Sequence, residues 1–331
     1  MTDKPLLSVL VPVFHTEHLL RQCLDSFLPQ TFMNFEILIC DDGSDGRDKE
    51  NHNSHHIYKE FKKACKKQRP DIKVRFIYHK KNLGILETRR TLVEEAATEI
   101  LCFTDSDDTV LPNYLKTLFN AYQESGAQIV QGHAKLFLNG KEVPSETRGI
   151  NTKTLGYIEG SQILDGFLVT HTHSSYLIGK LVTRSLLLQA FAQIPFLQCT
   201  MSDDLIIYIY MCIFAKKYYG IDTPVYNYNI TEGITSHTKI TTLERWEKVC
   251  SAASLYTALF AYIQDNPEAF TEQQQIIIKL LCRNALKNNI LQLRNAVDSS
   301  LQKEAHQMLC QWWGEHFVET IEKEMAEAPK K

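Results

Sequence analysis

Residues 101–108 read LCFTDSDD, an apolar run that ends in three carboxylates within four positions. Carboxylates disfavour strands and repel one another, so their place directly after apolar residues needs a physical reason. In a loop at the carboxyl end of a strand, Asp105 and Asp107 can both bind one divalent cation, because Mg²⁺ and Mn²⁺ prefer oxygen ligands. The alternative is a solvated turn in which Asp108 caps the helix that starts near Pro112. The surrounding sequence decides between the two.

The same alternation of apolar strand and polar cluster runs through the preceding residues. Continuous apolar runs predict buried strands at residues 6–14, 35–40, 73–79 and 99–104. Amphipathic spacing predicts helices over residues 16–28, 47–67 and from 84 onward, and Thr16 is the expected cap of the first. Strands that alternate with helices predict βαβ units. The expected fold is therefore α/β, with a mainly parallel sheet flanked by helices.

Polar clusters follow the ends of all four predicted strands, at His15, Asp41–Asp45, Asn82 and Asp105–Asp108. Ligands of open α/β sheets bind outside the carboxyl ends of the strands, so these clusters are expected to meet at one edge. There a carboxylate of the second cluster could accept hydrogen bonds from a base or a ribose. Taken alone, that segment is better explained as an ordinary Asp-Gly turn. Convergence of the four clusters favours a ligand site.

The pattern changes after about residue 128. Asn139-Gly140 predicts a two-residue hairpin turn. Asp203 and Asp204 stand directly before the apolar run at 205–215. Partial desolvation there would raise a carboxylate pKa and make a better base, whereas acids at a helix N-terminus also serve as caps. From about residue 243, long stretches without Gly or Pro predict three or four amphipathic helices in a C-terminal subdomain.

The composition is that of a globular protein, since the 331 residues are 44% hydrophobic and carry a formal net charge of −3. This excludes a disordered chain and a nucleic-acid-binding surface spread over the whole protein. The longest apolar run, at 205–215, is shorter than the ~20 residues that span a bilayer. The N-terminal run, interrupted by Pro12, does not resemble a signal peptide. The nine cysteines form no CxxC pair. We therefore expect a soluble, intracellular protein with free thiols.

Other motifs have simple structural explanations beside functional ones. The segment NHNSHH at 51–56 could bind a metal, but its Asn-rich surroundings favour a solvated loop. The basic run from Lys59 to Lys67 is expected to be a solvated helix face. His171 and His173 could contact phosphates or support the structure. Trp312-Trp313 should pack between the terminal helices.

Several motifs in order resemble those of family 2 glycosyltransferases, which have the GT-A fold. Residues 6–45, LLSVLVPVFHTEHLLRQCLDSFLPQTFMNFEILICDDGSD, are similar to the opening of that family, and NLGILETRR (82–90) and CFTDSDD (102–108) continue the similarity. It covers about residues 6–125. It continues more weakly in SSYLIGKLVTRSLL (174–187), SDDLIIYIYM (202–211) and VYNYNITEGITSHTK (225–239). The residues from about 243 carry no motif of the family.

The resemblance implies roles for individual residues. The nucleotide-sugar-binding set would be Pro12, Phe14, Glu17, Asp41, Asp42, Asn82, Gly84, Arg89, Asp105 and Ser106. Phe14-His15 stand where the family usually has Tyr-Asn. Asp107 would be the main metal ligand, Asp105 would reach the ribose or the metal, and His237 would be a late metal or diphosphate contact. Asp204 would be the catalytic base, and Asp203 replaces the glutamate of the family's Glu-Asp pair.

The activity implied by the resemblance is inverting sugar transfer from a nucleotide diphosphate sugar, with a UDP-sugar as the expected donor and Mn²⁺ or Mg²⁺ as cofactor. The acceptor would be a glycan or a lipid-linked glycan in surface polysaccharide synthesis. Contact with the inner face of a membrane and a homo-oligomer are compatible with this, and nucleic acid is not an expected partner. One alternative is a nucleotidyltransferase, although VPVFHTEHL (11–19) lacks its Gly-rich phosphate loop. Another is a non-catalytic binding module, against which Asp105, Asp107 and Asp204 count.

The expected domain division follows the same motifs. Residues 1–240 would form the GT-A catalytic domain, with a nucleotide-sugar-binding half at 1–125 and an acceptor-binding half at 126–240. Residues 241–331 would form the C-terminal helical subdomain.

Overall fold

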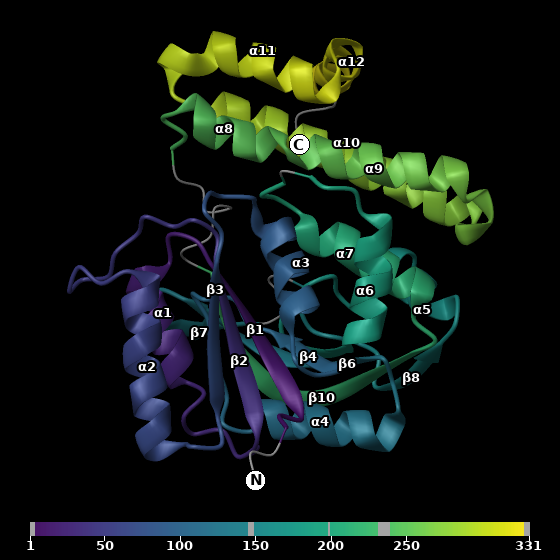
Figure 1. Cartoon of the computed structure of the whole chain (residues 1–331). Helices are drawn as coiled ribbons and strands as arrows, with labels where there is room; N and C mark the ends of the chain where they lie inside the picture. The colour runs from purple at the N-terminus through teal and green to yellow at the C-terminus, as the bar shows by residue number, and fades with distance from the viewer. Residues whose placement is uncertain (1–3, 145–148, 198, 231–238, 328–331) are drawn as a thin grey trace.

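The computed structural model describes residues 4–144, 149–197, 199–230 and 239–327 (Figure 1). Strands and helices alternate in the first part of the chain, as predicted. Its elements are β1 (Leu7–Val13), α1 (Glu17–Asp25), β2 (Phe35–Asp41), α2 (Ser54–Gln68), β3 (Lys73–Tyr78), α3 (Ile85–Glu95), β4 (Ile100–Phe103), β5 (Thr109–Val110) and α4 (Tyr114–Ser125). All four strands foreseen in this part of the sequence are present.

The second part continues the sheet with more varied connections. Its elements are β6 (Ile129–Leu138), β7 (Lys141–Val143), β8 (Gly156–Glu159), α5 (Gln162–Leu168), β9 (Lys180–Thr183), α6 (Arg184–Gln193), α7 (Asp203–Phe214) and β10 (Lys217–Asn229). Asn139 and Gly140 both have positive φ, at 51° and 73°, between the antiparallel strands β6 and β7. These are the dihedrals that a two-residue hairpin turn requires, so the predicted hairpin is confirmed.

The strands form one mixed sheet in the order β3-β2-β1-β4-β9-β6-β10-β5, with β7 beside β6 and β8 beside β10. Parallel pairs join β3, β2, β1 and β4, and also join β6 to β10; β9 runs antiparallel to both of its neighbours. The predicted α/β class with a mainly parallel, helix-flanked sheet is confirmed. Because β1, β2 and β4 are parallel, their carboxyl ends meet at one edge.

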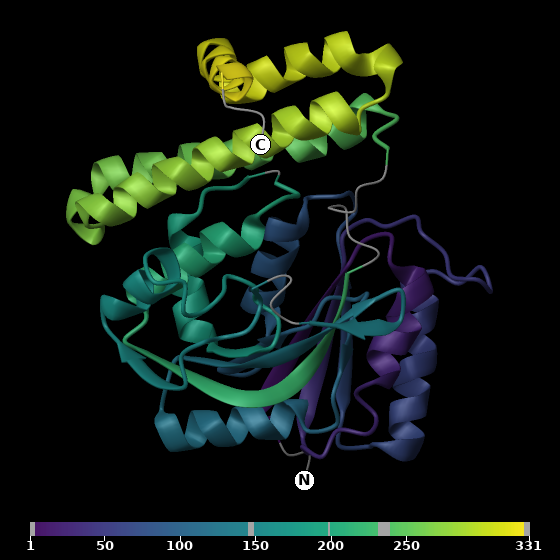
Figure 2. The ribbon, with the colours of Figure 1, turned by 180° about the vertical axis from the view of Figure 1, so that it is seen from behind.

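Helices cover both faces of the sheet, and the alternation of side chains along the strands explains why (Figures 1 and 2). In β1, Val9 and Val11 pack with α1, α2 and α4, whereas Leu10 between them packs with α3, α5, α6 and α7. Successive strand residues point to opposite faces, so a strand buried on both faces must be apolar throughout. This is the reason that the continuous apolar runs identified the strands.

Five α-helices follow in the described C-terminal part, where three or four were expected. They are α8 (Leu243–Cys250), α9 (Ala252–Asp265), α10 (Glu272–Asn295), α11 (Gln302–Trp313) and α12 (Glu315–Glu327), with short 3₁₀ helices at Pro267–Ala269 and Ser299–Leu301. They share their own apolar cluster, and both views show them lying across the end of the sheet domain. Trp313 packs in this cluster and donates to Asn289 at 3.0 Å, as its predicted role requires.

The structure corrects three local predictions. Helix α2 begins at Ser54 and not at residue 47, because Asn53 caps it by accepting from the His56 backbone. Thr16 precedes α1, but its hydroxyl pairs with Ser106 at 2.6 Å and caps nothing. Asp108 does not cap α4; its buried carboxylate accepts from the Tyr226 hydroxyl and from the Asn229 backbone.

Two predictions about the whole chain are tested by simpler observations. All nine cysteines are free, and eight of them are buried, as expected. Within the described ranges, no helix has the length and the apolar content needed to cross a bilayer.

Candidate active site

A pocket of about 800 Å³ opens at the carboxyl edge of the sheet, within the size range of small-molecule sites. Most of the predicted site residues line it: Pro12, Phe14, Asp42, Asn82, Gly84, Arg89, Asp105, Ser106, Asp107 and Asp204. Glu17 and Asp41 are not among its lining residues, and His237 lies outside the described residues. The sheet edge, the start of α3, the start of α7 and the helix α8 together form the walls.

Arg89 is the central cation of this pocket. It is only 4% exposed and hydrogen-bonds to three carboxylates, Asp105 at 3.1 Å, Asp203 at 2.5 Å, and Asp204. Burial alone would lower the pKa of Arg89, but the three carboxylates outweigh it, so this pKa lies above its ordinary value. The arginine therefore stays charged and joins the loop after β4 to the start of α7. The resemblance placed Arg89 among the nucleotide-sugar-binding residues and gave no hint of these partners.

In the loop after β4, two carboxylates line the pocket and the third makes hydrogen bonds within the fold. Burial raises the pKa of Asp105, against the opposing effect of Arg89. Its backbone N–H donates to Tyr226 Oη at 3.1 Å, and the Asp107 carbonyl accepts from Asn229 at 2.8 Å. These contacts tie the loop to the end of β10. Asp105 and Asp107 line the pocket, while the third carboxylate of LCFTDSDD, Asp108, is used for folding.

Asp203 and Asp204 occupy the first turn of α7, where the helix dipole favours acids. Their side chains are 10% and 25% exposed, so Asp204 is the one more open to the pocket. Burial raises the pKa of Asp203 to about 7, although Arg89 opposes the shift. Both acids stand at a helix N-terminus and also line the pocket, and the predicted role as a base stays a prediction.

Asp42 is buried and its carboxylate accepts four hydrogen bonds. The donors are His79 at 2.7 Å, and Asn82, Leu83 and Gly84 at 2.9 Å each. Gly84 has a φ of 93°, and a Cβ there would lie 2.9 Å from the Cys199 carbonyl. Asp42 thus holds the segment that opens α3, and only glycine fits at position 84. Its predicted contact with the base stays a prediction.

Glu17 and Asp41 support a neighbouring loop. Glu17 accepts from the Ser44 hydroxyl at 2.5 Å, and its carboxylate lies against Gly46, so a Cβ there would require the Glu17 side chain to move. Asp41 accepts from the Ser44 backbone at 2.8 Å and from the Ser54 hydroxyl. Both carboxylates hold the segment after β2 in place by hydrogen bonds, and neither lines the pocket.

The helix α8 supplies a pocket wall that the sequence did not predict. Glu244, Arg245 and Lys248 line the pocket, and Lys248 Nζ lies 5.5 Å from the centre of the Phe14 ring. Phe14 also stacks on His15, with 4.0 Å between the ring centres. On a helix without a recognisable motif, nothing in the sequence distinguishes these cations from ordinary surface residues.

Two buried titratable groups lie behind the pocket, near α7. Lys180 is fully buried, and its ammonium donates to the carbonyl of Tyr176, a pocket residue. Burial lowers the pKa of Lys180 to about 7. His173 is bonded to the Ile163 carbonyl at 3.0 Å and to the Tyr208 hydroxyl at 2.7 Å. His173 therefore has the structural role of the two considered for it.

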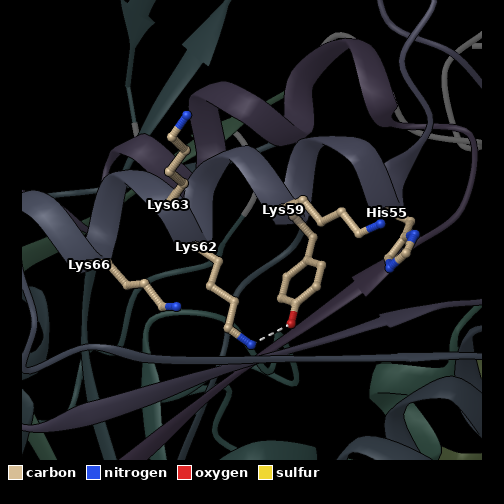
Figure 3. A pocket seen from close by; sticks show the side chains of 6 residues that line it. His55, Lys59, Lys62, Lys63 and Lys66 are labelled. Carbon is tan, nitrogen blue, oxygen red and sulfur yellow. Dashed lines mark hydrogen bonds between the residues drawn. The ribbon is translucent and has the colours of Figure 1, made fainter.

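A second hollow lies on the outer face of α2 and is shown in Figure 3. It is lined by His55, Tyr58, Lys59, Lys62, Lys63 and Lys66. Lys59, Lys63 and Lys66 are exposed, as predicted for a solvated helix face. No carboxylate is among the residues that line this hollow, unlike the pocket at the sheet edge.

The donor groups in the main pocket fit a magnesium-type or manganese-type cation. Asp105 and Asp107 offer carboxylate oxygens only, in a pocket where Asp203 and Asp204 add further negative charge. Mg²⁺ is commonly held by one or two carboxylates together with substrate phosphates. Arg89 neutralises part of this charge, which leaves an acidic pocket suited to a cation.

The fold is that of the GT-A glycosyltransferases. S. aureus TarS 1–349 in complex with UDP-GlcNAc superposes with a TM-score of 0.56 at 18% identity, covering 97% of this chain and 92% of that one. The mannosyltransferase PcManGT from Pyrobaculum calidifontis, in complex with GDP-Man and Mn²⁺, gives a TM-score of 0.53 at 13% identity and covers 99% and 89%. At these identities the likeness concerns the fold.

The sequence comparisons give the family. The model of Glycosyl transferase family 2 matches residues 8–177, about half of the chain, and the chain belongs to that family. Glycosyltransferase GlyG from Streptococcus pneumoniae is 32% identical over 128 residues, which are 39% of this chain and 38% of GlyG. The Escherichia coli glucosyltransferase WfgD is 25% identical over 137 residues, covering 41% and 49%. The matched region spans less than half of either relative.

Proposed function

We propose that this protein transfers a sugar from a nucleoside diphosphate sugar to an acceptor hydroxyl, with inversion at the anomeric carbon. The observation that carries the proposal is the junction at Arg89. It brings Asp105, from the loop after β4, within reach of Asp204, 99 positions further along the chain. A site for this reaction needs a donor-binding wall and a base on the acceptor side, and Arg89 joins the two.

In this proposal Asp204 is the general base. It would take the proton of the acceptor hydroxyl while that oxygen attacks the anomeric carbon, and a single displacement inverts the carbon. Its greater exposure than Asp203 supports this choice. Asp203 and Arg89 would position it, since both contact the same start of α7. The transition state would resemble an oxocarbenium ion, by analogy with glycoside hydrolysis.

Asp107 and Asp105 would hold a divalent metal. When bound, Mg²⁺ or Mn²⁺ supplies electrostatic stabilisation of charge on the departing diphosphate. The residues from Pro12 to Phe14, together with Asn82 and Ser106, would contact the nucleotide, and Asp42 would contact its base. His237 is kept as a proposed late contact.

A UDP-sugar is the proposed donor, and the TarS complex with UDP-GlcNAc supports this choice among proteins of the same fold. The proposed acceptor is a glycan or lipid-linked glycan, in line with the diphosphoundecaprenol acceptor in the name of WfgD. Such an acceptor would place the enzyme at the cytoplasmic side of a membrane, in peripheral contact. We also keep the division into a catalytic domain at 1–240 and a helical subdomain at 241–331.

The test is a panel of nucleotide sugars offered to the purified protein with Mn²⁺ or Mg²⁺. Slow hydrolysis of one UDP-sugar, dependent on metal and abolished by Asp204→Asn, is expected. Pyrophosphate-dependent formation of UTP would instead indicate a nucleotidyltransferase. Binding of a nucleotide sugar without turnover, with or without added glycan acceptors, would indicate a binding module and overturn the proposal.

A further inference from the structure

Two histidines and a glutamate meet at the start of α2, where His52 precedes the helix and His56 and Glu60 lie one turn apart on it. His52, His56 and Glu60 each offer one ligand atom, and the three atoms lie within 4.8 Å of one another. This is the one group of three or more such side chains found in the described part of the chain. Imidazole and carboxylate together suit Zn²⁺ and similar transition metals.

The separations approach those of a metal's ligand shell. Ligands about 2.0 Å from a tetrahedral Zn²⁺ stand roughly 3.3 Å apart. His56 Nε2 lies 3.5 Å from Glu60 Oε1, and the three ligand atoms all lie within 4.8 Å of one another. The rings of His52 and His56 stack, with 3.8 Å between their centres. Because the two rings are nearly parallel, at least one of them must turn out of the stack to aim its nitrogen at a shared ion.

The backbone holds both histidines in place before any ion binds. The Asp48 carboxylate accepts from the backbone of Glu50 and His52 at 2.9 and 2.8 Å, and Asp48 N–H donates to the His52 carbonyl at 3.0 Å. These bonds close a tight turn that positions His52 beside α2. Asn53 then caps the helix by accepting from His56 N–H at 2.9 Å. A site built on fixed backbone loses little entropy when it binds.

The surroundings also resemble those of a metal site. His52 Nδ1 is buried and makes no hydrogen bond, although Asp48 and Glu50 carboxylate oxygens lie 3.5 and 3.6 Å away. Arg21 bonds to the other oxygen of Glu60, leaving Oε1 turned toward His56. Outer partners of this kind orient a ligating carboxylate. Two carboxylates surround this unbonded imidazole nitrogen, and a bound cation would balance their negative charge.

We propose that His52, His56 and Glu60 form a zinc-type transition-metal site, with Asp48 or water completing the coordination. A bound ion would fasten the segment after β2 to α2. That segment contains Ser44 and Asp45, which contact His15 at 3.0 and 2.8 Å on the rim of the main pocket. The metal would therefore stabilise the pocket wall from outside. The site is separate from the carboxylates of Asp105 and Asp107 and does not depend on the proposed sugar transfer.

The test is a titration of the metal-free full-length protein with Co²⁺, in excess Mg²⁺ to occupy oxygen-only sites. Visible absorption bands at one equivalent, displaced by Zn²⁺, are expected. His52→Ala and His56→Ala should weaken the binding at least tenfold, since even the outer partners of metal ligands typically contribute 10–100-fold. His55→Ala is the matched control, because His55 is exposed beside His56 but belongs to the lysine face in Figure 3. It should bind like the wild type.

Three outcomes would overturn the proposal. They are no stoichiometric Co²⁺ binding, binding that survives both histidine substitutions, and a thiolate charge-transfer band that assigns the ion to cysteine. A second measurement uses the wild-type protein alone. Zn²⁺ should protect His52 and His56, but not His55, from diethylpyrocarbonate modification mapped by mass spectrometry. Equal modification of all three with and without Zn²⁺ would refute the site even if a variant failed to fold.

Discussion

Among single residues, Asp204 is the one on which the proposed chemistry most depends. Asp204→Asn removes the base but keeps a side chain that Arg89 can still contact, so the fold and the donor pocket should persist. We expect transfer to fall by at least about 10²-fold, the lower range for general-base catalysis, with donor affinity changed less than threefold. Initial rates and calorimetric UDP-sugar binding measure the two effects.

The control for this substitution is Asp265→Asn, an exposed carboxylate at the end of α9. It should transfer at the wild-type rate. Wild-type turnover by Asp204→Asn would show that another group takes the proton, and Asp203 would then be the next to test.

His173 gives a prediction about stability and pH. Burial lowers the pKa of His173 to about 3 from an ordinary value of 6.5, so the folded protein keeps it neutral. Below pH 6.5 the unfolded chain protonates this histidine, whereas the native state keeps it neutral. The free energy of unfolding therefore falls as the pH falls toward 3. The decrease in the free energy of unfolding that comes from His173 approaches about 1.4 kcal/mol per pH unit. His173→Gln should remove this contribution.

The measurement compares the urea unfolding free energies of wild type and His173→Gln between pH 4 and 6. Carboxylates such as Asp105 and Asp203, whose raised pKa values oppose this trend, are the same in both proteins and cancel in the difference. The variant should have the lower stability at pH 6, and the gap should narrow on acidification. Parallel pH curves would contradict a neutral buried His173.

At the scale of elements, α8 tests whether the C-terminal helices contribute to the pocket. Arg89 is engaged by carboxylates, so an anionic donor needs other cations, and Lys248 and Arg245 line the same pocket. Lys248→Met keeps the length of the side chain and removes its charge. We expect donor affinity to fall about fivefold, near 1 kcal/mol, and its salt dependence to decrease.

The matched control is Lys279→Met on α10, an exposed helical lysine away from the pocket. It should bind the donor like the wild type. If the wild type, Lys248→Met and Lys279→Met bind the donor with equal affinity at low salt, then α8 lines the pocket without binding the donor.

The elements also show where sequence patterns succeed. The strands and most helices of the first part were predictable, because a strand buried on both faces is apolar throughout and a covering helix is apolar on one side. The start of α2 was not, since the turn at 48–52 depends on bonds between the Asp48 side chain and nearby backbone groups. Thr16 and Asp108 failed as caps because distant residues, Ser106 and Tyr226, compete for their side chains.

At the scale of the whole molecule, the acidic pocket predicts a requirement for metal. Asp105, Asp107, Asp203 and Asp204 line one pocket with a donor whose diphosphate is also anionic. Chelation by EDTA should therefore weaken UDP-sugar binding at least tenfold, and Mn²⁺ or Mg²⁺ should restore it. Measured in a His56→Ala background, the effect cannot come from the site on α2. Unchanged binding after chelation would refute the account of the Asp105 and Asp107 pair.

The sequence by itself determined the α/β class, the edge of the sheet where the site lies and most of its residues. Apolar periodicity and the carboxylates after the strands are local features, and parallel strands necessarily bring their carboxyl ends together. Only the tertiary structure decided how the charges are shared. Arg89 meets Asp203 and Asp204 across more than a hundred positions, and α8 reaches Phe14 across more than two hundred. Which carboxylate serves the fold and which faces the pocket depends on these long-range contacts, because neighbouring aspartates such as Asp107 and Asp108 are chemically alike until folding buries one and leaves the other open.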